Sequence, residues 1–194
     1  PTRETQKLAA GLAAVQIQLA EVLARIASDL RGEPTTQDAT AWHEQAVELR
    51  NQVLGLSVQY EDLAKHSKWS PRTNSIDLSS LKELLRSNQV MSARVLNIAN
   101  DLRSATRSNL NTQIPSAALS PLADLLEMAA NNLATDDPAQ NIGLTAAHQA
   151  VRGADMTAQI ALMGGIVSHV NEINKATNRE TDDTGAVEPT PEKA

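Results

Sequence analysis

Apolar residues recur along the chain at alternating intervals of four and three positions. The first series of these residues is Leu8, Leu12, Val15, Leu19, Val22 and Ile26. This spacing places every member on one stripe of an α-helix and is typical of a heptad seam. It predicts a helix from near Glu4 to Arg31, roughly 40 Å long at about 1.5 Å per residue. Gly32 and Pro34 end it, because glycine accepts a left-handed C-cap and proline cannot continue a helix.

Two further seams predict the second and third helices. Thr35 or Thr36 can cap the second helix, which ends near His66 and has the seam Trp42, Ala46, Leu49, Val53, Leu56, Tyr60 and Leu63. Caps within 77–80, with Ser80 and Glu83 as a capping box, open the third helix. Its seam is Leu81, Leu84, Asn88, Met91, Val95, Ile98 and Leu102. Asn88 is a polar residue on an apolar stripe, where it can fix helix register at some cost in stability.

The rest of the chain predicts one short helix and one long one. Ser120 followed by Pro121 indicates a helix of about 121–134, because proline favours the first helical position. Asp137 and Pro138 begin the last helix, which reaches Thr177 and has the seam Met156, Ile160, Met163, Val167 and Val170. The pair Gly164 and Gly165 indicates a kink or a close helix crossing. Residues 179–194 are charged and contain prolines, which predicts a disordered acidic tail.

Together these patterns predict an all-α fold. We expect one domain, residues 1–178, built as an elongated antiparallel bundle of four long helices plus one short helix. Composition agrees, since aromatic residues make up 2% of the chain and Phe is absent, whereas strands favour aromatic and β-branched residues. A solenoid is the second choice, because no sequence repeat of the usual length is evident.

Charge and motifs argue against several function classes. The net charge is −6 with both signs interspersed, whereas a nucleic-acid binder needs a basic stripe. There is no cysteine, which excludes disulfides and thiolate metal sites. No Glu-x-x-His motif supports a metal site in the bundle, so we expect the histidines to be solvated or hydrogen-bonded. Nucleophile and phosphate-loop motifs are also absent, and we expect neither an enzyme nor a cofactor. No apolar run reaches the ~20 residues that a membrane span needs.

Three features are candidate interaction sites. In "HSKWSPRTNS", Trp69 can fold over the helix ends while Arg72, after Pro71, bonds helix carbonyls; alternatively this loop contacts another domain or subunit. Met156 and Met163 are either core residues or the adaptable lining of a groove. Alanine-rich faces such as "LAAGLAA" let helices approach closely and are candidate self-association surfaces.

Three segments resemble a known family. They are "ELRNQVLGLSVQYEDLAKHSKWSPR" (48–72), "MSARVLNIANDL" (91–102) and "IALMGGIVSHVNEINKATNRETDD" (160–183). Their order resembles the soluble C-terminal domain of actinobacterial aromatic acid exporter or fusaric acid resistance-like membrane proteins. The resemblance implies a cytoplasmic helical domain that follows a membrane-spanning part of the same polypeptide, at the cytoplasmic face of the membrane. A start at Pro1 without Met fits such a piece. No functional residue is carried over from the family.

We therefore expect a non-catalytic domain that mediates assembly or gating and forms a homo-oligomer. Two alternatives stay open. One is a bundle that senses a small aromatic ligand held between its helices. The other is an adaptor domain for protein–protein interaction.

Overall fold

The computed structural model describes residues 3–67, 75–114, 116–135 and 160–182, and all regular secondary structure within them is helical. The helices are α1 (Arg3–Leu30), α2 (Thr36–Ser67), α3 (Ser75–Arg107), α4 (Leu110–Gln113), α5 (Ser116–Thr135) and α7 (Ile160–Asp182). The expected all-α antiparallel bundle is confirmed, with α5 as its shortest member and α4 as an additional single turn.

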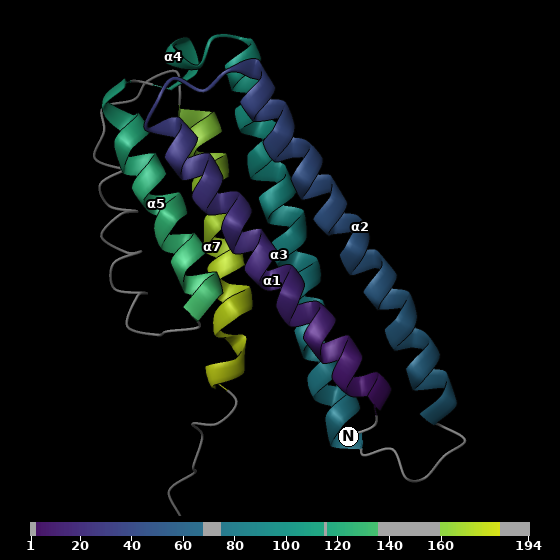
Figure 1. The fold of residues 1–194 in the computed structure, drawn as a ribbon. Helices are drawn as coiled ribbons and strands as arrows, with labels where there is room; N and C mark the ends of the chain where they lie inside the picture. Colours follow the sequence, from purple (N-terminus) through teal and green to yellow (C-terminus); the bar gives the residue numbers. More distant parts are fainter. Residues whose placement is uncertain (1–2, 68–74, 115, 136–159, 183–194) are drawn as a thin grey trace, which may run out of the picture.

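The helices run side by side along one long axis (Figure 1). Helix α1 contacts α2, α3 and α5, while α3 contacts α1, α2 and α7. Helix α7 packs mainly on α3 and to a smaller extent on α5. The first and third helices therefore form the centre of the bundle, and α2, α5 and α7 cover their sides.

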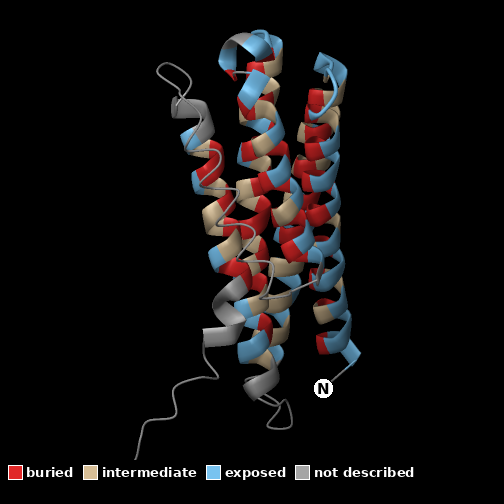
Figure 2. Ribbon diagram, turned by 90° about the vertical axis from the view of Figure 1, so that its left-hand side faces the viewer, coloured by how far each residue is buried: buried red, intermediate tan, exposed pale blue. Residues whose placement is uncertain are grey.

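The heptad seams form the core, which appears as the buried stripe inside the bundle in Figure 2. All six seam residues of α1 are buried, as are the first four of α2. The last three seam residues of α2, Leu56, Tyr60 and Leu63, are only partly buried. The C-terminal half of α2 is thus less completely covered than its N-terminal half.

The start of α2 agrees with the sequence, but two other predicted starts are wrong. Thr35 caps α2: its Oγ1 accepts from the backbone N–H of Asp38 at 3.2 Å, and Asp38 Oδ2 accepts from the backbone N–H of Thr35 at 2.8 Å. Helix α3 begins at Ser75, so Ser80 lies inside it. Since 75–80 holds neither glycine nor proline, no residue there stops the helix from extending toward its N-terminus.

Helix α5 begins at Ser116 instead of Pro121, which is its sixth residue. Proline at this position has no N–H to offer the carbonyl of Ala117, and this costs the helix one hydrogen bond. The added residues also bury Ala118 completely. We infer that the packing of this extra turn compensates for the missing bond.

No unusually close helix crossing occurs at the glycine pair of α7. The helix is continuous through Gly164 and Gly165. A Cβ at Gly164 would meet nothing within 4 Å, and one at Gly165 would lie 3.9 Å from Asp101 Oδ2. Helix α7 also continues to Asp182, past Thr177. The predicted start of this helix at Asp137, and residues 183–194 of the expected tail, lie outside the described residues.

Candidate functional site

Most of the predicted interaction residues cannot be compared with the structure. Trp69, Pro71, Arg72 and Met156 lie outside the described residues, and Met163 belongs to the first turn of α7, whose side chains are not described. The structure therefore brings none of these five into a described site.

Asn88 lies in the bundle core, with 0% of its surface exposed. Its Nδ2 donates to the backbone carbonyl of Leu84 at 3.0 Å. Its Oδ1 is buried without a hydrogen-bond partner in the described part of the chain. Asn88 is therefore a residue of the helix interface and offers no surface to a ligand or partner.

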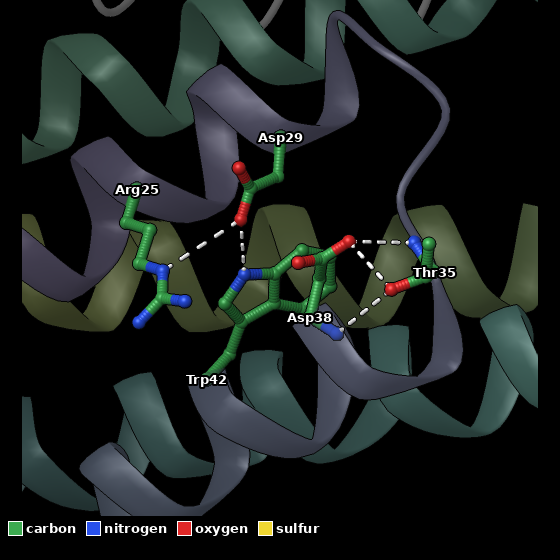
Figure 3. A network of polar contacts seen from close by, with 5 residues as sticks. All are labelled: Arg25, Asp29, Thr35, Asp38 and Trp42. Carbon is green, nitrogen blue, oxygen red and sulfur yellow. Dashed lines mark hydrogen bonds and ion pairs between the residues drawn. The ribbon is translucent and has the colours of Figure 1, made fainter.

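The corner between α1 and α2 is built around Trp42 (Figure 3). This side chain is fully buried, and its Nε1 donates to Asp29 Oδ2 at 2.7 Å. Arg25 Nε lies 3.8 Å from the same carboxylate oxygen. The aromatic residue that packs at this corner is Trp42, near the N-terminal end of α2. The sequence had suggested such a role for Trp69, which follows the C-terminal end of α2.

Helices α3 and α7 are joined by a cluster of three ionisable side chains. Arg94 Nη1 donates to His169 Nδ1 at 3.2 Å, and His169 Nε2 lies 3.7 Å from Asp101 Oδ2. Burial lowers the pKa of His169, with Asp101 opposing and Arg94 reinforcing this change. Burial raises the pKa of Asp101, which the nearby His169 opposes. Arg94 and Asp101 therefore both reach from α3 across to α7.

A similar pair joins α2 to α3. Arg103 Nη1 donates to His43 Nδ1 at 2.9 Å. Burial lowers the pKa of His43, and the positive charges of Arg103 and Arg107 lower it further, against Glu44. The expectation of hydrogen-bonded histidines is confirmed here and at His169. No local sequence pattern pairs these residues, since they lie 60 and 75 positions apart.

A groove lies between the N-terminal end of α1 and the C-terminal end of α2. It encloses about 300 Å³ and is lined by Glu4, Lys7, Gln59, Asp62, Leu63 and His66. Most of these residues are charged or polar, but their aliphatic stems also contribute to the lining.

Part of the outward face of α1 is apolar. Its exposed residues at intervals of three and four are Lys7, Ala10, Ala14, Ile17 and Glu21, and Ile17 is 51% exposed. An 18-residue window of α1 has a mean hydropathy of 1.3, yet only 39% of that window is buried. By length and composition α1 is apolar enough to cross a membrane, a test that the core helix of a bundle also passes. We call these five residues the α1 outer face.

The chain matches no known protein family, no curated protein and no solved structure. Among the residues that the structure describes, no three His, Asp or Glu side chains converge to hold a metal ion. The fold and its polar contacts define a helical packing module, in which side chains connect helices across an apolar core.

Proposed function

We propose that this chain is a non-catalytic helical domain that mediates assembly by pairing with a second copy of itself through the α1 outer face. The observation that supports this is the apolar surface that α1 leaves exposed after packing on three other helices. Contiguous exposed apolar surface commonly marks an interaction site. Alanines at this face allow two helix backbones to approach closely.

The charges at the ends of this face are self-complementary. Lys7 lies seven residues before Ala14, and Glu21 lies seven after it. At about 1.5 Å per residue, each charge is roughly 10 Å from that centre. An antiparallel two-fold pair about Ala14 places each Lys7 opposite Glu21 of the second copy, twice per interface. A parallel pair would set like charges against each other, so the charge pattern favours the antiparallel arrangement.

The oligomeric state of charge-reversed variants tests this proposal. Sedimentation velocity at micromolar concentrations should show the wild type self-associating. K7E and E21K alone should each weaken pairing roughly tenfold, because two attractive contacts become repulsive. Mixing the two variants should restore association, since every charged pair in that heterodimer is again opposite in sign.

A matched pair of substitutions provides the control. Ile17 and Leu54 are exposed apolar residues of similar exposure, 51% and 47%, but Leu54 lies on α2. I17E should abolish pairing because it places a charge in the centre of the contact, whereas L54E should leave it unchanged. A monomeric wild type at these concentrations, or equal effects of both substitutions, would reject the proposal.

The placement of this domain at the cytoplasmic face of an exporter-like membrane protein, where it would take part in assembly or gating, rests on the sequence resemblance alone. Reading the coding sequence upstream of Pro1 tests it directly. Four to six hydrophobic spans encoded there would support it, and a start codon immediately before Pro1 would overturn it.

A further inference from the structure

Helix α7 lies at the side of the bundle, where it packs mainly on α3 and to a smaller extent on α5. Its buried apolar residues are Ile166, Val167, Val170, Ile173 and Ala176. Its contact with α5 includes a hydrogen bond between two neutral amides, in which Asn132 Nδ2 donates to Asn174 Oδ1 at 2.6 Å. Much of what holds α7 therefore lies on α3, where Arg94 and Asp101 are the charged partners of His169.

The geometry of this cluster fixes the proton on His169 at neutral pH. A guanidinium group only donates hydrogen bonds, so the Nδ1 that Arg94 contacts at 3.2 Å must be an acceptor. His169 is then neutral and carries its proton on Nε2, which faces Asp101 Oδ2 at 3.7 Å. The imidazole is held between a cation and a carboxylate that lie seven residues apart on α3, and its side chain is 17% exposed.

A second proton on His169 is incompatible with this arrangement. It would go to Nδ1, where an N–H donor would face the Arg94 donor and two positive charges would lie about 3.2 Å apart. Burial of His169 also disfavours its charged form, and Asp101 opposes both effects only while its own carboxylate is charged. Burial raises the pKa of Asp101, so this carboxylate loses its charge earlier in an acid titration than an ordinary aspartate.

We propose that Arg94, His169 and Asp101 form an acid-sensitive latch, which holds α7 against α3 at neutral pH and releases it when His169 becomes protonated. The latch does not depend on self-association through α1, because all of its groups lie on α3 and α7. Its release would expose the apolar face of α7 and the surface of α3 beneath it. Mildly acidic pH would therefore uncover a second apolar surface on the bundle.

Hydrogen exchange of the full chain tests the latch. Amide protection in 160–182 should be compared at about pH 7.5 and about pH 5.5, after correction for the intrinsic rates. We expect protection of α7 to fall about tenfold at the lower pH, the factor produced by losing one charge-assisted hydrogen bond. Protection of α1 should change little. Equal protection of α7 at the two pH values would overturn the proposal.

Substitutions separate the latch from a general effect of acid. H169Q should remove the pH dependence of α7, because glutamine accepts from Arg94 at both pH values and does not titrate. H66Q, at an exposed histidine near the end of α2, should leave it intact. R94M removes a positive charge and should therefore raise the pKa of His169, measured by NMR titration. This measurement does not depend on whether H169Q folds. Persistence of the pH dependence in H169Q, or an unchanged pKa in R94M, would refute the latch.

Discussion

Replacing Asn88 with leucine should make the protein more stable. The side chain is fully buried, and only one half of its amide is satisfied: Nδ2 bonds Leu84 while Oδ1 has no partner among the described residues. An unpaired buried polar atom costs about 1–3 kcal/mol. Leucine removes this cost and fills a similar volume, although a branched side chain that fits imperfectly can cost about 1 kcal/mol. The net gain in unfolding free energy should therefore reach up to about 2 kcal/mol.

Urea denaturation followed by circular dichroism measures this gain. With a slope of about 2 kcal/mol per molar urea, the midpoint should rise by up to about 1 M without a change in slope. Asn88→Asp serves as the contrast, because it adds a charge at the same buried site and should destabilise the bundle strongly. If Asn88→Leu lowers the midpoint while the native spectrum is retained, the buried oxygen is not costly and the reasoning fails.

The same substitution tests whether Asn88 sets helix register. A polar residue on an apolar seam can exclude alternative alignments of neighbouring helices. If it does so here, the leucine variant should gain stability but show additional or broadened amide signals in a two-dimensional NMR spectrum. A single sharp set of signals would show that the apolar seams alone specify the register.

Three further outcomes follow from individual contacts. W42F removes the 2.7 Å hydrogen bond to Asp29 from a fully buried site and should cost about 2 kcal/mol in urea denaturation; an unchanged midpoint would contradict this. G164A should raise the melting temperature through better helix propensity, since a Cβ there meets nothing within 4 Å. G11A should raise it less, because its Cβ would lie 3.0 Å from a side-chain methyl of α2. Equal increases in melting temperature for the two variants would show that this crowding is harmless. The lowered pKa of His43 means that folding favours its neutral form, so its contribution is complete above about pH 6.5 and is lost as pH falls through the lowered pKa. H43Q should therefore reduce the acid loss of stability in urea denaturation between about pH 7 and pH 5, and an unaltered loss would assign it to other groups.

Helix positions were largely predictable because they depend on local periodicity. The seam of α1 predicted both its extent and its buried face, and Thr35 was found as the cap of α2. The predicted starts at Ser80 and Pro121 failed for a common reason. A capping residue marks a permitted start, but packing of the preceding turn decides whether the helix extends further, as the buried Ala118 shows in α5.

The sequence by itself determined that this chain folds as helices with one apolar face, because that face depends only on the spacing of nearby apolar residues. Only the tertiary structure decided which polar groups meet. His169 forms a hydrogen bond with Arg94, which lies 75 positions away in the sequence, and Trp42 donates one to the carboxylate of Asp29. It also decided that α1, apolar on more than its seam, keeps Ile17 and its alanine neighbours at the surface. These outcomes depend on which helix faces pack against one another. The packing of the whole bundle decides this, and no single segment does.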